Sequence, residues 1–145
     1  MSQKTLLQAE DPKIYDEEVR LSIGDTVVGR INTTDATVTT LLSIPLRPSA
    51  TTLLRVLVWA RRTGGSSGTA EDGAGYVLYG VYKVVAGVGT AVGGTTPTLD
   101  FGAEDQAGWN ATLTLSGQNV LVRVTGAANN NITWVARAHV DRVET

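Results

Sequence analysis

The sequence predicts an all-β protein, an antiparallel β-sandwich of the jelly-roll or immunoglobulin-like kind with about 7 to 9 strands and an extended N-terminal arm. Three observations lead to this prediction. Gly accounts for 16 of the 145 residues, above the usual ~7%. Segments rich in Val and Thr alternate apolar and polar residues and are separated by Gly and Asn turns. No convincing helical periodicity follows residue 18. The chain length suits one domain, which we place at residues 19–145.

Residues 1–18 differ in composition from the rest and are expected to form the arm. They concentrate acidic residues, and Pro12 interrupts any helix there. Three interpretations stay open: a disordered or loosely packed tail, an extended arm that docks on a neighbouring subunit, or a short helix at the start. The apolar anchors available for docking are Leu6, Leu7, Ile14 and Tyr15.

Strands are expected along the first half of the domain. Val19, Leu21 and Ile23 alternate before a turn at Gly24 and Asp25, and the β-branched segment 36–46 ends near Pro45. Segment 51–62 alternates most clearly. Its even positions 54–60 are apolar, whereas Arg55, Leu57, Trp59 and Arg61 share the opposite face.

Four further strands are expected over 75–85, 109–115, 120–126 and 132–143. Trp109 and Trp134 fall in phase with the inward residues of their strands, so we assign both to the core. The intervening run "AGVGTAVGGTTPT" at 86–98 is expected to form a flexible hairpin or loop, because it lacks the spacing of a phosphate-binding loop.

Some strands are apolar on both faces. In segment 75–85, Val77, Tyr79 and Val81 occupy one face, while the other is also apolar. Such a strand either lies centrally between two layers or is covered by a partner subunit, and both options stay open. The candidate interface residues are Leu6, Leu7, Ile14, Tyr15, Leu57, Trp59, Val77, Tyr79, Val81, Leu121 and Val135.

Composition argues against several functional classes. The net charge is −2 and the pI about 5.3, so we expect no nucleic-acid partner. There is no cysteine, and hence no disulfide framework, thiolate metal site or thiol nucleophile. The sequence contains no apolar run of about 18 residues, so no membrane-spanning helix is predicted. The N-terminus lacks the apolar region of a signal peptide, so synthesis in the cytoplasm is expected.

Catalytic residues are not evident. The single histidine, His139, lies on an outward face with Arg137 and Asp141, and no Gly-x-Ser-x-Gly motif supplies a nucleophile. A hidden pair of carboxylates, Glu71 or Asp72 with Glu104 or Asp105, is the remaining enzymatic alternative. We expect no enzyme, no catalytic residue and no cofactor.

Two stretches nearly match: "AEDGAGY" at 70–76 and "AEDQAGW" at 103–109. Calcium takes six to eight oxygen ligands, and two carboxylates per loop supply few of them, so solvated turn residues are favoured and no metal ligand is assigned. Each copy is expected to end a Gly-rich loop and begin a strand with an aromatic residue. Whether the two loops lie at the same end of the sandwich stays open.

The order of segments over about residues 50–143 resembles that of a known group of proteins. "LLRVLVWARR", "AGYVLYGVYKVV", "WNATL", "VLVRVTGAA" and "ITWVARAHV" follow one another. This order is similar to that of β-sandwich modules in tailed-bacteriophage virion proteins, namely head decoration proteins, head fibres and tail-fibre pieces. The resemblance implies a structural role, no cofactor, and trimers as a common assembly.

We therefore expect a non-enzymatic structural subunit located in the virion, a capsid decoration or stabilising protein on the outer surface of a phage head. Its partners would be the major capsid protein or other virion proteins, and a homo-oligomer is expected, with a trimer favoured. The alternative is a tail-fibre or receptor- or glycan-binding module. In that case Trp59 and the loops 63–75 and 86–97 would form the contact.

Overall fold

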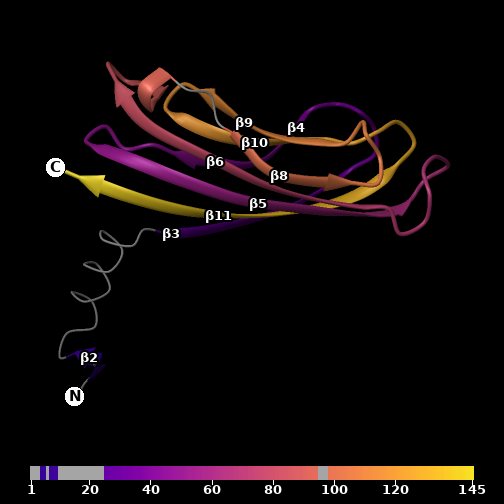
Figure 1. The fold of residues 1–145 in the computed structure, drawn as a ribbon, viewed down its shortest axis with the longest axis horizontal. Coiled ribbons are helices and arrows are strands. Elements are labelled where there is room, and N and C mark those ends of the chain that lie inside the picture. Colours follow the sequence, from indigo (N-terminus) through magenta and orange to yellow (C-terminus); the bar gives the residue numbers. More distant parts are fainter. Residues whose placement is uncertain (1–3, 6, 10–24, 95–97) are drawn as a thin grey trace.

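A computed structural model describes residues 4–5, 7–9, 25–94 and 98–145. Residues 25–94 and 98–145 form a β-sandwich in which a six-stranded sheet packs against a three-stranded sheet. Figure 1 shows the two layers edge-on, with β3, β5, β6 and β11 in one layer and β4, β9 and β10 in the other. The predicted antiparallel sandwich is confirmed.

The strands are short near the N-terminus and long in the sandwich. Their bounds are β1 Lys4–Thr5, β2 Leu7–Ala9, β3 Asp25–Thr33, β4 Thr39–Pro45, β5 Ala50–Gly64, β6 Gly73–Val85, β7 Val88–Ala91, β8 Thr98–Glu104, β9 Asn110–Ser116, β10 Asn119–Thr125 and β11 Asn131–Glu144, with a 3-10 turn, η1, at Val92–Gly94. Within the described residues, no helix has the length and apolar character to cross a membrane.

The six-stranded sheet has the order β3-β11-β5-β6, after which the edge of β6 is shared by two strands. β8 pairs with Ala74–Tyr79 and β7 pairs with Tyr82–Val85. The smaller sheet has the order β4-β10-β9. β9 and β10 are joined through Gly117, whose φ of +59° suits glycine at a tight hairpin turn. All of these pairs are antiparallel.

The core lies between the sheets and is built from alternate residues of each strand. Leu54, Val56 and Val58 of β5 and Val120, Val122 and Val124 of β10 belong to this core, and all six are buried. Trp109 and Trp134 are buried as predicted, with ring centroids 5.8 Å apart and planes tilted by 55°. This geometry suits the electrostatic preference of aromatic pairs.

The two sheets lie close together where β3 passes β4. A Cβ atom at Gly29 would lie 2.6 Å from Leu42 Cδ2 and 2.8 Å from the Leu41 carbonyl oxygen. Only a residue without a side chain fits this contact unless the strands move apart.

Two local predictions differ from the structure. Asp25, predicted in a turn, is the first residue of β3, which runs on to Thr33; Val19, Leu21 and Ile23 lie outside the described residues. Strand β8 is not among the strands that alternation predicts. Its pairing with β6 shifts register between Val77 and Leu78, and this irregularity breaks the period-2 pattern by which a strand is recognised.

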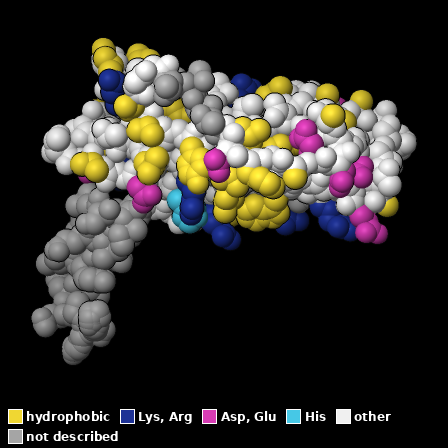
Figure 2. All heavy atoms as spheres, viewed as in Figure 1, with side chains coloured by type: hydrophobic (Ala, Val, Ile, Leu, Met, Phe, Trp, Pro, Cys, Tyr) yellow, Lys and Arg dark blue, Asp and Glu magenta, His cyan; other side chains and the backbone are white. Residues whose placement is uncertain are grey.

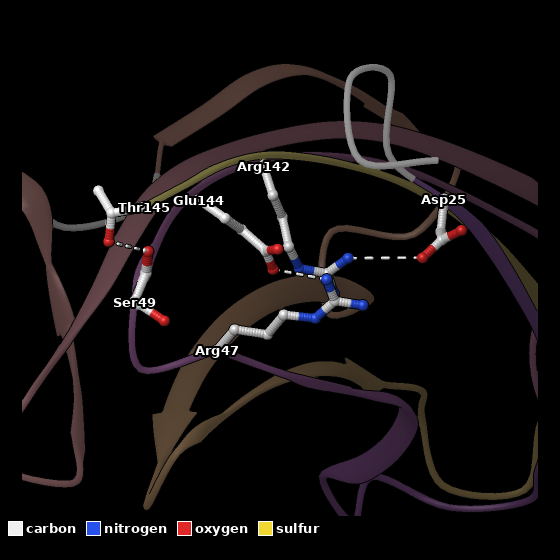
Figure 3. A network of polar contacts seen from close by, with 6 residues as sticks. All are labelled: Asp25, Arg47, Ser49, Arg142, Glu144 and Thr145. Atoms are coloured by element: carbon white, nitrogen blue, oxygen red, sulfur yellow. Dashed lines mark hydrogen bonds and ion pairs between the residues drawn. The ribbon is translucent and has the colours of Figure 1, made fainter. Parts of the chain in front are cut away.

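A cluster of polar contacts holds the first sandwich strand to the end of β11 (Figure 3). Arg142 Nη1 lies 3.4 Å from Asp25 Oδ2, and Arg47 Nη1 donates to Glu144 Oε2 at 2.5 Å. Thr145 Oγ1 donates to the Ser49 carbonyl oxygen at 3.4 Å. The Asp25–Arg142 contact joins the start of β3 to β11, and the other two contacts join the β4–β5 connection to the end of β11.

Candidate functional site

The face of the six-stranded sheet that points away from the small sheet is the candidate site. We call it the open face. It consists of the outward side chains of β3, β11, β5, β6 and β8, because the inward residues of the same strands form the core. Within the described residues, no element packs over it.

Strand register arranges the open face in rows across the sheet. One row is Arg30, Val135, Trp59, Gly75 and Ala103. The next is Val28, Arg137, Leu57, Val77 and Phe101, and a third is Thr26, His139, Arg55 and Tyr79. Cross-strand neighbours of this kind lie about 4.5–5.5 Å apart, so the rows form a continuous surface.

Large apolar side chains on the open face remain accessible. The exposed fraction is 41% for Trp59, 57% for Phe101 and 62% for Val28. Figure 2 shows hydrophobic side chains gathered along this side of the molecule, with Lys and Arg side chains beside them. Exposed apolar side chains grouped on one face are typical of an interaction site.

Basic side chains surround the apolar residues. Outward positions on β3, β5, β6 and β11 carry five basic residues, Arg30, Arg55, Arg61, Lys83 and Arg137, and one acidic residue, Asp141. None of the five forms an ion pair within the described part of the chain, where the ion pairs are Arg47–Glu144 and Arg142–Asp25. The outward sides of these four strands are therefore basic, although the chain is acidic overall.

The arginines and the tryptophan are close enough to act together. The Arg137 guanidinium carbon lies 5.8 Å from the centroid of the Trp59 ring, within range of a cation–π interaction. A hollow of about 340 Å³ beside Trp59 is also lined by Arg30, Arg61 and Val135. Tryptophan, tyrosine and arginine on one face are the residues that most often dominate protein–protein contacts.

Most of the predicted interface residues of the sandwich fall on the open face: Leu57, Trp59, Val77, Tyr79, Val81 and Val135. Leu121 does not, because it points outward from β10 in the other sheet. Leu7 lies in β2, and Leu6, Ile14 and Tyr15 lie outside the described residues.

Sequence reasoning missed Arg30, Val28, Leu53 and Phe101 as members of the face. Alternation over residues 26–32 could have identified the first two. Leu53 is in phase with Leu57 and Trp59 on β5. Phe101 could not be assigned, since its strand was not predicted.

His139 and Asp141 share the open face, as predicted. They line a hollow of about 440 Å³ with Asp25, Arg55 and Tyr79. The two side chains are not hydrogen-bonded to each other among the described residues. This arrangement lacks the oriented base that nucleophilic catalysis uses.

The two Ala-Glu-Asp stretches lie side by side at one end of the sandwich. The Gly73 N–H donates to Asp105 Oδ2 at 2.8 Å, and the Asp105 N–H donates to the Gly73 carbonyl oxygen at 3.0 Å. Gln106 Nε2 donates to Asp72 Oδ2 at 2.5 Å. Hydrogen bonds of the repeated residues therefore connect the two loops.

The carboxylates of these stretches accept hydrogen bonds from backbone and side-chain donors, and so stabilise the loops and strands around them. The Thr69 N–H donates to Asp72 Oδ2 at 2.9 Å and, with the Gln106 amide, holds the pKa of Asp72 below its ordinary value. The Tyr76 hydroxyl donates to Glu104, and burial raises the pKa of Tyr76. Among the described residues, no three acidic or histidine side chains are grouped to hold a metal ion.

The two stretches differ in their strand context. Tyr76 is the fourth residue of β6, whereas Ala103 and Glu104 still belong to β8 and Trp109 precedes β9. The prediction that each copy follows a Gly-rich loop is therefore wrong for the second. Strand β8 replaces the loop there.

Comparisons with known proteins give structural similarity only. No family model and no curated protein matches the chain. The solved structures that resemble it include the tailspike protein of Acinetobacter baumannii phage AM24, at 10% identity and a TM-score of 0.50, which covers 83% of this chain and 27% of that one.

Two further tailspike structures resemble the chain less closely. The tailspike of Acinetobacter phage vB_ApiP_P1 has 12% identity and a TM-score of 0.43, covering 83% of this chain and 22% of that one. The tailspike of Acinetobacter baumannii bacteriophage Fri1, a capsular polysaccharide depolymerase, has 10% identity and a TM-score of 0.38, covering 81% and 17%. The chain thus spans about a quarter or less of each tailspike, and what it shares with the first is the fold.

Proposed function

We propose that this chain is a non-enzymatic structural module of a phage tail protein that joins another virion chain through its open face. The observation that carries the proposal is the open face itself. Exposed aromatic, aliphatic and arginine side chains form continuous rows across five strands. Covering this surface with a second chain would remove a large apolar area from water.

The fold favours a tail location over the head-decoration role expected from the sequence. A tailspike of phage AM24 contains a module with this fold over 83% of the chain. The decoration role has no comparable structural support. The predicted glycan-binding alternative rests on Trp59, whose exposed ring beside Arg30 and Arg61 could stack on a sugar.

The non-enzymatic part of the proposal rests on side-chain chemistry. The chain has one histidine and no cysteine. Asp72 accepts hydrogen bonds that stabilise a turn, and Glu104 accepts one from Tyr76. These hydrogen bonds give both carboxylates a structural role, which supports a non-enzymatic module.

Localisation on virions tests the proposal. Particles carrying a tagged wild-type chain would be labelled and imaged, together with particles carrying Val77→Asp. The matched control is Leu121→Asp, which places the same charge outward on the small sheet. Circular dichroism confirms that each variant is folded.

We expect label at the tail for the wild type and Leu121→Asp, and loss of label for Val77→Asp. Label on the head would contradict a tail location, and normal incorporation of Val77→Asp would contradict the role of the open face. Binding of purified protein to a glycan array, lost in Trp59→Ala, would instead favour the glycan-binding alternative.

A further inference from the structure

We propose that the hollow beside Trp59 binds an aspartate or glutamate side chain of the partner chain, held between Arg30 and Arg61. This inference rests on the proposed function and names the chemistry that the partner presents to the open face. The hollow has a volume of about 340 Å³. It is lined by Arg30, Trp59, Ala60, Arg61, Thr63, Thr133 and Val135.

Strand register places the two arginines on opposite sides of the hollow. Arg30 on β3 and Trp59 on β5 are both paired with Val135 of β11, and Arg61 of β5 is paired with Thr133. The strands that carry the arginines are therefore separated by β11, a span of about 10 Å. Because both arginines line the same hollow, one ligand group above β11 can contact both.

The charge of these two arginines is not neutralised within the described part of the chain. No acidic residue lines the hollow, and neither arginine forms an ion pair with another described residue. The hollow at the other end of the open face differs, because Asp25 and Asp141 accompany Arg55 there. Two unneutralised guanidinium groups favour an anion, and their fork of N–H donors fits a carboxylate.

The hydrogen-bonding groups of the lining favour an acceptor over a neutral ligand rich in hydroxyl groups. The Thr133 hydroxyl donates to Asn32 Oδ1 at 2.8 Å, and the Thr63 hydroxyl donates to the Asn131 carbonyl oxygen at 3.2 Å. Both threonine protons are thus used within the fold, which leaves the guanidinium and indole N–H groups as side-chain donors. The lining contains no carboxylate or side-chain amide that would accept from a sugar hydroxyl. A carboxylate, which only accepts hydrogen bonds, matches these groups.

The surroundings of the hollow favour a protein as the source of the carboxylate. Apolar surface continues from Trp59 and Val135 into the next row, where Val28 and Phe101 have exposed fractions of 62% and 57%. An acidic sugar stacked on Trp59 would leave this aliphatic and aromatic surface in water. A polypeptide can place a carboxylate in the hollow and cover the apolar rows at the same time.

Covering the apolar rows would strengthen the contact with the arginines. Water is then excluded around Trp59, and a charge pair is stronger in the lower effective dielectric that results. Loss of one member of such a pair costs affinity, because the other charge stays buried without a partner. Arg30 and Arg61 should therefore select a partner that carries an acidic residue among apolar ones.

Photo-cross-linking in assembled virions tests the contact with the full chain. The chain would carry p-benzoylphenylalanine in place of Thr63, an exposed residue of the hollow, and the linked peptide would be identified by mass spectrometry. The matched control has the same group in place of Leu121 on the other sheet. We expect position 63, and not position 121, to link to a peptide of another virion chain with an aspartate or glutamate beside the linked residue. A linked peptide without an acidic residue, or linkage to a glycan, would overturn the proposal.

Removal of charge gives an independent readout. Arg30→Gln and Arg61→Gln would be combined in one chain, and the copies of the chain per virion counted by quantitative mass spectrometry. We expect a loss of at least about tenfold. The control, Arg47→Gln, removes a positive charge from the β4–β5 connection and should leave incorporation near the wild-type level. Normal incorporation of the double variant, or an equal loss in Arg47→Gln, would overturn the proposal.

Charge exchange then tests the pairing directly. A chain carrying Arg30→Glu and Arg61→Glu should be excluded from wild-type virions. It should be incorporated again when the acidic partner residue found by cross-linking is changed to arginine. Failure to recover incorporation would overturn the pairing.

The failure of this inference is distinguishable from the failure of the proposed function. If Val77→Asp is excluded from virions while position 63 links to no acidic peptide, the open face still joins a partner, but not through Arg30 and Arg61. If Val77→Asp is incorporated normally, the proposed function fails, and this inference fails with it.

Discussion

Trp109 and Trp134 are both fully buried, but their indole N–H groups have different surroundings. Trp134 Nε1 donates to Thr33 Oγ1 at 2.9 Å, and Thr33 is itself buried. Trp109 Nε1 is buried and donates to no group of the described residues. The periodicity of the sequence places both rings in the core, but it carries no information on where either N–H points.

Replacing each tryptophan with phenylalanine should therefore have unequal effects. Trp134→Phe leaves the Thr33 hydroxyl buried without its donor, whereas Trp109→Phe removes an unpaired donor. We expect Trp134→Phe to lower the free energy of unfolding by about 1 kcal/mol more than Trp109→Phe. Urea denaturation of both variants measures the difference, and equal losses would contradict the role of the Thr33 bond.

The hydrogen bonds that Asp72 accepts predict that the stability of the fold depends on pH. Hydrogen bonds from the Thr69 N–H and the Gln106 amide lower the pKa of Asp72 in the folded state. The ionised carboxylate therefore stabilises the fold above the unfolded pKa of about 3.9, and this contribution is lost as the pH falls through the folded pKa.

Asp72→Asn should consequently be less stable than the wild type at pH 5, and the difference should shrink as the pH falls below about 3.9. Thermal unfolding between these conditions measures the effect. Glu71→Gln removes the same charge from the same loop and serves as the control. A difference that stays constant with pH would show that Asp72 acts only through its shape.

Strand β3 depends on a residue that cannot be larger than glycine. At Gly29 an added Cβ would meet Leu42 Cδ2 at 2.6 Å and the Leu41 carbonyl oxygen at 2.8 Å. The Leu41 oxygen belongs to the backbone, so the contact cannot be relieved by a rotamer change alone. Gly75 on β6 is different, because an added Cβ there would have no atom within 4 Å.

We expect Gly29→Ala to lower the free energy of unfolding by about 1–3 kcal/mol through overpacking. Gly75→Ala, the control in the same sheet, should change it by less than about 0.5 kcal/mol. Guanidinium denaturation distinguishes the two. Similar values for both variants would mean that β3 and β4 can separate freely.

At the level of elements, regular strands were predictable and irregular ones were not. Strands β5, β10 and β11 alternate without interruption over their central residues, so their faces could be assigned residue by residue. β8 contains Asp100 and Gly102, two residues that are depleted in strands, and it shifts register on β6. Tertiary pairing along the free edge of β6 overrides its weak local preference.

Across the whole molecule, the sandwich could be predicted but the extent of the open face could not. Leu57, Trp59, Val77, Tyr79 and Val81 follow from the alternation of two strands. Bringing Val28, Arg30 and Phe101 beside them requires the strand order, which places β3 next to β11 and β8 next to β6. Sequence periodicity assigns faces within a strand and contains no information on which strands are neighbours.

The charge distribution of the molecule predicts a salt effect on assembly. Basic residues are concentrated on the outward sides of β3, β5, β6 and β11. If an acidic partner chain covers them, raising the ionic strength from about 0.05 to 1 M, where the screening length falls to about 3 Å, should weaken its attachment. Release of the chain from virions at each salt concentration measures the effect. Full retention at high salt would show that apolar contacts dominate instead.

The position of β11 has a consequence for synthesis of the chain. The last strand of the domain, Asn131–Glu144, lies between β3 and β5 and pairs with both. While the ribosome is still making this segment, β5 has no partner along one edge and β3 has none in the sheet, and exposed edges of that kind promote aggregation. The large sheet can therefore be completed only after the whole domain has been translated. The yield of folded protein should depend on how quickly β11 is synthesised.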